Sequence, residues 1–357
     1  FIQFSIGEFR CGLVHMLVGF FSRLGGTPIQ RGKADWIGLK SARNLFANGL
    51  FPMAAAPEGG TNGLSEIVSP LEPGIAQLGF WCAEDLQKAG RSEQVFILPV
   101  GIKYSYTNPP WESIEQLLSE LEEASGLPVD ENGFDRALPQ EILYPRLIRL
   151  AVHLLSVMEN FYQRFYRYSS ELKIPEIETS DGNEAIAARL KSLLDSALKV
   201  SEDYFELLPK GNFYDRCRRL EQAGWNYIFR EDLKDIKALS TIEKRLADRV
   251  AEEANLRMWH MRLVESFVAV TGKYVREKPT AERFAETTLI LWDMVARIKG
   301  SNPFKRPKLG KQQVRITIGE PLSISDKFEN YQTNRKAARI AVADFTHDLQ
   351  QAMEKLI

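Results

Sequence analysis

The spacing of apolar residues in the first third of the chain alternates between two patterns. Apolar side chains recur three or four positions apart over residues 10–26, 34–49 and 74–90, which predicts three helices. Continuous apolar runs at 50–56 (LFPMAAA) and 94–104 (QVFILPVGIKY) predict buried strands. Because helices and strands alternate, this part of the chain predicts an α/β layer with a largely parallel sheet.

The pattern becomes almost purely helical after Trp111. Apolar stripes predict helices at 141–169, 184–207, 213–230, 233–272 and 280–298. A segment rich in Pro, Gly and Lys follows at 301–313, then a predicted strand at 313–324 and a final helix at 330–357. We therefore expect one α/β domain formed by residues 1–110 and 312–357, interrupted by a helical insertion at 111–311.

Composition and charge narrow the class of protein. The chain has 357 residues, is 44% hydrophobic and 26% charged, and carries a formal net charge of −1, as an ordinary globular protein does. The balanced charge gives no global reason to expect a nucleic-acid partner. Three widely spaced cysteines do not form a disulfide framework or a metal site, so a reducing compartment fits best and no metal is expected.

Five short sequence motifs, taken together, resemble those of a known protein family. They are GGTPIQRG, APEGGTNG, LEPGIAQL, ILPVGIKY and VRITIGEPL. In order and spacing they resemble the glycerol-phosphate and lysophospholipid acyltransferase superfamily, over roughly residues 1–106 and 312–357. The resemblance implies an acyltransferase-type, mostly parallel sheet flanked by helices, with the all-helical insertion inside that domain.

The resemblance also implies binding roles for particular residues. Arg31 matches the arginine that meets the acceptor phosphate, a task suited to the planar guanidinium. The loop Glu58, Gly59, Gly60 and Thr61 matches the acceptor-binding motif, although it holds one extra glycine. Pro99 matches the apolar motif on the acyl side. Taken one at a time, these residues also fit a surface cation, a solvated turn and a sheet edge.

The family's catalytic pair, histidine-x4-aspartate, has no counterpart in the chain. At that offset His15 is followed by Phe20, His153 by Met158 and His260 by Glu265, while His347 lies near the end. In the family a histidine acts as base and the aspartate orients it. We expect the pair upstream of Phe1, interpret the chain as a fragment that lacks its start, and leave the catalytic residues unknown. This span alone is predicted to be inactive.

The resemblance thus implies an acyltransferase of glycerolipid synthesis. It would transfer an acyl group from acyl-CoA or acyl carrier protein, as co-substrate and without a cofactor, to a hydroxyl of a glycerol-phosphate or lysophospholipid. We expect it at the cytoplasmic side of a membrane, peripheral or anchored through the missing start. The alternative is a non-catalytic member of the same fold that binds lipid or a partner. A helical scaffold with a chance motif match is a third interpretation.

One aromatic and one basic segment could each contact a membrane, but each also has an interpretation that involves no membrane. The aromatic cluster from Phe161 to Tyr166 fits a core helix of the insertion, with membrane contact as the alternative. The cations from Lys305 to Lys311 fit a solvated linker, with contact to anionic headgroups as the alternative.

Overall fold

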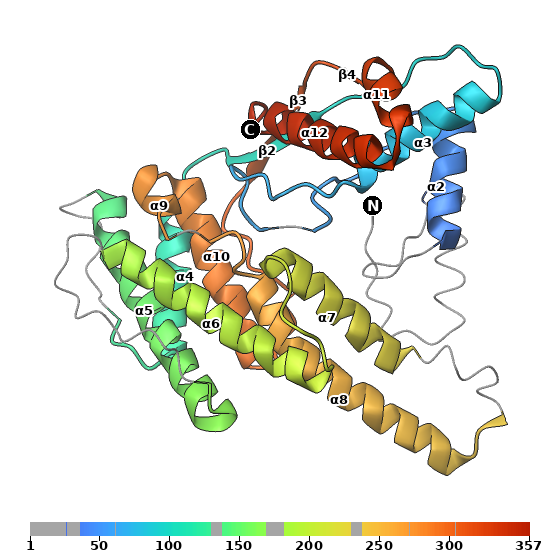
Figure 1. Cartoon of the computed structure of the whole chain (residues 1–357). Coiled ribbons are helices and arrows are strands. Elements are labelled where there is room, and N and C mark those ends of the chain that lie inside the picture. Colours follow the sequence, from blue (N-terminus) through green and yellow to red (C-terminus); the bar gives the residue numbers. More distant parts are fainter. Residues whose placement is uncertain are drawn as a thin grey trace. The chain divides into compact units, whose positions relative to one another are not determined.

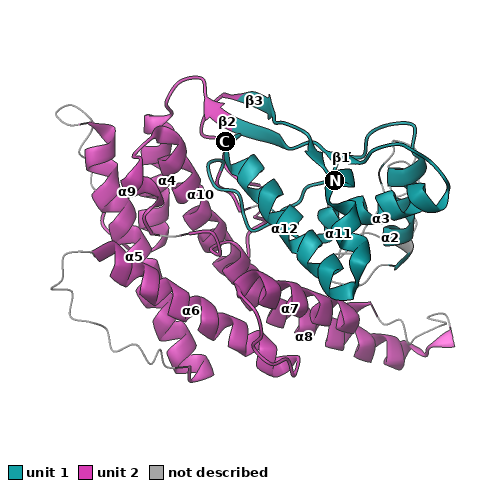
Figure 2. Cartoon of the chain, turned by 45° about the horizontal axis from the view of Figure 1, so that its top comes forward, with its two compact units in different colours: residues 1–61, 65–103, 314–357 teal, residues 62–64, 104–313 magenta. Residues whose placement is uncertain are grey.

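The chain forms two compact units, most of them helical. The computed structural model describes Gly26 and residues 36–60, 62–129, 138–168, 182–229, 238–270, 272–303 and 305–357. Helices make up 64% of the described residues. The first unit comprises residues 1–61, 65–103 and 314–357, and the second comprises 62–64 and 104–313 (Figure 2). The described segments 36–60, 65–103 and 314–357, which are far apart in the sequence, therefore fold together in the first unit.

The first unit combines helices with short strands, of which β2 and β3 each continue for two or three residues into the second unit (Figure 1). The elements are α2 (Trp36–Asn48), α3 (Gly74–Lys88), β1 (Phe96–Ile97), β2 (Val100–Tyr106), β3 (Gln312–Ile318), β4 (Leu322–Ser323), η3 (Ser325–Lys327), α11 (Phe328–Thr333) and α12 (Arg335–Glu354). The helices at 34–49 and 74–90 were predicted, and they form within a few residues of those bounds. Asn334 caps α12 by accepting hydrogen bonds from the backbone N–H groups of Lys336 and Ala337.

The predicted mostly parallel sheet is wrong. β1 pairs with β4 and β2 pairs with β3, and both are small antiparallel two-stranded sheets. Pro99 lies between β1 and β2 and divides the predicted continuous strand, because proline has no N–H to donate to a ladder. The run 50–56 forms no strand, and Leu50 and Phe51 are 94% and 84% exposed. Apolar character identified a strand at 94–104, whereas pairing direction depends on residues far away in sequence.

Three aromatic side chains pack together in the core of the first unit. Phe80 on α3 stacks on Tyr331 of α11 with a centroid distance of 4.5 Å and meets Phe345 of α12 edge-on at 6.1 Å. Gly79 allows Ile324 to approach closely, because a Cβ at Gly79 would lie 2.9 Å from the Ile324 side chain. The core of the first unit therefore combines these three rings and Ile324 with aliphatic side chains, mainly from α3 and α12.

The second unit is a set of packed helices. The helices are α4 (Trp111–Ala124), α5 (Pro139–Tyr166), α6 (Gly182–Tyr204), α7 (Phe213–Ile228), α8 (Thr241–Glu265), α9 (Tyr274–Glu277) and α10 (Ala281–Ile298). Capping boxes start α7 at Asn212 and α8 at Ser240, where each cap side chain accepts from the backbone three residues on. α7 lies along α8, as Figure 1 shows. Helices were predicted for most of 111–298, and they form in the described ranges of that part of the chain.

Candidate functional site

The predicted acceptor loop forms a turn that is tied back to the following segment. The Oε2 atom of Glu58 accepts a hydrogen bond from the backbone N–H of Ser69 at 2.7 Å. The backbone N–H of Glu72 donates to the carbonyl oxygen of Pro57 at 2.8 Å. Gln350 on α12 adds a further tie, since its Oε1 atom accepts from the N–H of Leu71 at 3.0 Å. The Glu58 carboxylate therefore has a structural partner within the loop.

Gly59 is required by the backbone of this turn. Its φ is +69°, a left-handed conformation that side chains with a Cβ adopt at a cost. A Cβ at this position would also lie 2.0 Å from Oε1 of Glu72. The group that approaches the backbone of Gly59 closely is thus a side chain of the protein itself, that of Glu72.

Of the other predicted site residues, the structure describes Pro99 and Gly60 but not Arg31 and Thr61. Pro99 is buried, and its carbonyl oxygen accepts from the N–H of Gly319 at 2.9 Å, which joins the ILPVG and TIGEP blocks. Gly60 is half-buried in the turn. Arg31 and Thr61 lie outside the described residues. The structure therefore joins the ILPVG and TIGEP blocks at Pro99. It does not test the predicted role of Arg31 in binding phosphate.

The three described histidines are each engaged in a structural contact, and His15 lies outside the described residues. The Nε2 atom of His153 lies 3.0 Å from the carbonyl oxygen of Ser125, and that of His347 lies 3.0 Å from the side-chain amide of Gln351. The Nδ1 atom of His260 lies 2.8 Å from the hydroxyl oxygen of Tyr162. These contacts assign none of the three as a catalytic base.

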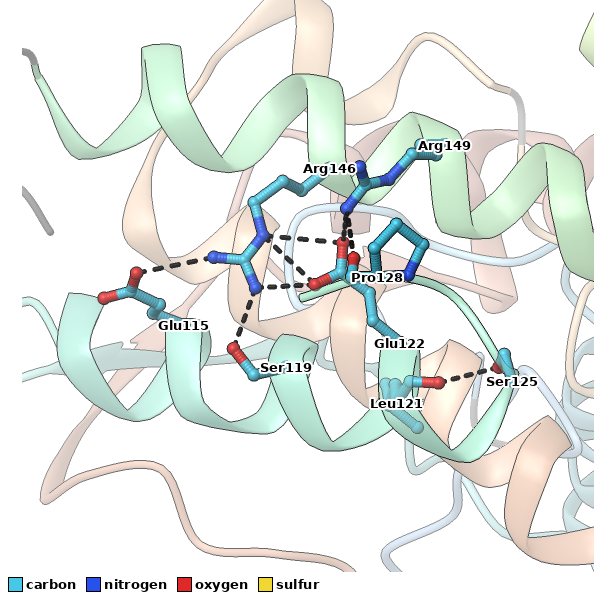
Figure 3. A network of polar contacts seen from close by, with 8 residues as sticks. All are labelled: Glu115, Ser119, Leu121, Glu122, Ser125, Pro128, Arg146 and Arg149. Carbon is cyan, nitrogen blue, oxygen red and sulfur yellow. Dashed lines mark hydrogen bonds and ion pairs between the residues drawn. The ribbon is translucent and has the colours of Figure 1, made fainter. Parts of the chain in front are cut away.

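Two buried charge networks occur in the second unit. Glu122 on α4 is fully buried and accepts from Arg146 at 2.6 Å and from Arg149 at 2.7 Å, both on α5 (Figure 3). Arg146 also donates to Ser119 at 2.8 Å and pairs with Glu115 at 3.4 Å (Figure 3). Opposite charges are matched one to one in this network, so it fits the joining of α4 and α5 better than ligand binding.

The second network links α6 and α7. Arg216 is 6% exposed, and its guanidinium bonds both oxygens of Glu202 at 2.8 and 2.7 Å. Its remaining terminal nitrogen bonds Asp195 at 2.6 Å. This fork-to-fork geometry fixes the register of the two helices and gives no open ligand position.

An apolar cavity of about 130 Å³ lies among the helices of the second unit. Its walls come mainly from α5, α6, α8 and α10. They include Leu147, Ala151, Leu154, Met158, Ile186, Ala187, Leu194, Ala197, Val264, Ile290 and Met294. Apolar space of this size is a feature to explain in a packed bundle, because protein interiors contain few voids larger than a water molecule. Sequence reasoning missed it, because an apolar stripe predicts burial and not a void.

The polar side chains at the cavity are three tyrosines and Thr287, and the tyrosine hydroxyls bond residues outside its walls. Tyr162 bonds His260, Tyr144 accepts from Asn183 at 2.9 Å, and Tyr274 donates to Glu286 at 2.5 Å. Burial lowers the pKa of His260 to about 4, with a smaller contribution from the charge of Arg257, so this histidine is neutral at pH 7. The cavity therefore has a hydrocarbon character.

Comparisons with known proteins assign no family to this chain. It matches no family model, no curated protein and no solved structure. Among the described residues, no three His, Cys, Asp or Glu side chains gather closely enough to hold a metal ion. Nor does any helix in the described ranges have the length and apolar character needed to cross a bilayer.

Proposed function

We propose that this chain belongs to an acyltransferase of glycerolipid synthesis. One observation carries the proposal: the described residues 56–60, 71–78, 97–103 and 314–322, which hold most of four motif blocks, belong to one compact unit. About two hundred residues separate the fourth block from the fifth, yet β1 pairs with β4 and β2 pairs with β3. This assembly supports a shared role for the blocks, although the sheet is not of the parallel kind that their resemblance implies.

The reaction would join an acyl group to a hydroxyl. The hydroxyl oxygen of a glycerol-phosphate or lysophospholipid attacks the carbonyl carbon of an acyl thioester, a base takes the hydroxyl proton, and the C–S bond breaks. The thiol of coenzyme A or of acyl carrier protein then leaves with a proton. None of the four histidines has an aspartate five positions later, so we assign no base within these 357 residues.

In this proposal the acceptor lies against Arg31 and the loop from Glu58 to Thr61. Arg31 would bind phosphate oxygens through two donors, and Glu58 would accept from an acceptor hydroxyl. A carboxylate has about four lone-pair sites, so hydroxyl recognition can coexist with the hydrogen bond from Ser69 to Glu58 Oε2. Pro99 would support the acyl side. The proposed setting is the cytoplasmic surface of a membrane, where a lysophospholipid acceptor would reside.

A second candidate is a non-catalytic lipid-binding or interaction module. The apolar cavity of the second unit favours it, because hydrocarbon binding needs no base. The two candidates differ in turnover: only the first predicts consumption of the acyl thioester.

The test uses the natural full-length polypeptide that contains these residues. With acyl-CoA and glycerol 3-phosphate or lysophosphatidate, Arg31→Ala should lower kcat/KM by roughly ten- to a hundredfold, the range of a lost charged hydrogen bond. Arg245→Ala, at a side chain that is 77% exposed on α8, is the matched control and should leave kcat/KM unchanged. Equal activity of both variants would refute the role of Arg31, and absence of thioester consumption would favour the second candidate.

A further inference from the structure

We infer that the cavity of the second unit binds the hydrocarbon tail of a fatty acyl chain. The inference rests on the walls of the cavity and does not depend on acyl transfer. The occupant could be presented as a free fatty acid, a lysophospholipid or an acyl thioester, since these share the same tail.

The shape of the lining favours a long and slender ligand. On α5 the lining residues extend from Tyr144 to Tyr162, which corresponds to roughly 27 Å of helix. On α6 they extend from Ile186 to Ala197. The volume of about 130 Å³ is close to that of cavities that hold one benzene ring. A narrow space along two helices fits part of an acyl chain better than a fused-ring ligand.

The chemistry of the lining excludes a polar occupant. The residues that line the cavity include no Asp, Glu, Lys, Arg or His. The hydroxyls of Tyr144, Tyr162 and Tyr274 already bond Asn183, His260 and Glu286. A polar group placed among these walls would lose its hydrogen bonds to water, whereas methylene groups would lose nothing.

The mouth of the cavity lies where the lining is half-buried. Tyr144, Ile186 and Ala187 are partly exposed, whereas Tyr162 and Ala197 are 1% and 3% exposed. An exposed ion pair between Lys273 and Glu184, 2.9 Å apart, lies at the same end of the cavity as Tyr144. Glu184 directly follows Asn183, whose side chain donates a hydrogen bond to Tyr144. The tail would therefore point toward Tyr162 and Ala197, with its head group in water beside this pair.

Two adjacent alanines on α6 provide a matched test. Ala187 lines the cavity, whereas Ala188 is exposed and does not. Leucine at either position adds the same three carbons, but only Ala187→Leu fills the space. The probe is the fluorescent fatty acid cis-parinaric acid, titrated against the full chain. Hexadecanoic acid, palmitoyl lysophosphatidate and palmitoyl-CoA serve as competitors that distinguish the head groups, and glycerol 3-phosphate serves as the tail-free control.

We expect saturable binding that the tailed competitors displace and glycerol 3-phosphate does not. Ala187→Leu should weaken binding at least tenfold, as methylene-sized changes in apolar pockets do. Ala188→Leu should stay within about twofold of the wild type. If Ala187→Leu does not fold, Ala197→Leu at the deep end replaces it.

Equal affinities in the folded cavity-filling variant and in Ala188→Leu would overturn the inference, as would non-saturable binding. Tail binding is measured without turnover. Binding without thioester consumption would therefore contradict the proposed acyltransferase and leave this inference supported.

Discussion

The hydroxyl of Tyr162 lies 2.8 Å from Nδ1 of His260, and both side chains are almost fully buried, at 1% and 3% exposure. The histidine is enclosed by the rings of Tyr162, Tyr166 and Trp259. Because Tyr162 also lines the apolar cavity, this pair connects α5 and α8 at the cavity's deep end. Protonation of His260 would place a charge among aromatic rings.

The first prediction concerns pH. The folded-state pKa of His260, about 4, lies below its ordinary 6.5, so the unfolded state binds more protons between these values. Stability is therefore complete above pH 6.5 and is lost as the pH falls toward 4. In urea titrations the free energy of unfolding of the wild type should fall by about 2 kcal/mol between pH 7 and 5, relative to His260→Asn. Parallel pH profiles of the two proteins would contradict this assignment.

The second prediction concerns the contact between α7 and α8. A Cβ on Gly224 would lie 2.1 Å from Sδ of Met258, whose side chain is fully buried. Gly224→Ala should therefore lower the free energy of unfolding by about 1–3 kcal/mol, the usual range for overpacking. In a Met258→Ala background the cost should vanish, which a double-mutant cycle measures. Gly74→Ala is the control, because a Cβ there meets nothing within 4 Å.

The third prediction separates backbone strain from contact in the Glu58 loop. Gly59 and Gly90 have similar φ values of +69° and +67°, but only a Cβ on Gly59 meets another side chain, that of Glu72. Gly90→Ala should lower stability by about 1 kcal/mol through strain alone. Gly59→Ala should lower the melting temperature further than Gly90→Ala. Equal melting temperatures would mean that Glu72 moves aside at no cost.

The fourth prediction concerns the buried pair Glu122 and Arg146. Glu122→Leu should lower the free energy of unfolding by about 3–5 kcal/mol, because Arg146, at 3% exposure, would lose its buried partner. The double variant Glu122→Leu/Arg146→Met should recover most of that loss, since both charges are then removed. Chemical denaturation measures both values. A double variant as unstable as Glu122→Leu would show that packing, and not the unpaired charge, is responsible.

The sequence predicted the helices well because their signal is local. The stripe at 74–90 became α3 at Gly74–Lys88, and the stripe at 280–298 became α10 at Ala281–Ile298. Tyr162, in the aromatic segment read as a core helix, is buried, although Phe165 is 64% exposed. Spacing of three or four residues reports a buried face and needs no knowledge of what covers it.

The sheet and the loop could not be predicted in the same way. The segment QVRITIGEPL was predicted to be a strand of a mostly parallel sheet. Instead, β3 pairs with β2 in a two-stranded antiparallel sheet, where Ile316 and Ile318 are 64% and 66% exposed. Glu58 was predicted to bind an acceptor, and its hydrogen bond to Ser69 depends on how residues 57–72 turn back. Both outcomes depend on partners that local patterns do not specify.

Transfer of a labelled acyl group from acyl-CoA to glycerol 3-phosphate or lysophosphatidate tests the central claim most directly. The enzyme source is the natural full-length polypeptide, with liposomes of anionic phospholipid present. We predict release of one free thiol for each labelled glycerolipid formed, with both products dependent on the acceptor. Thiol release without labelled glycerolipid, or no release with either acceptor or with acyl carrier protein as donor, would contradict the claim.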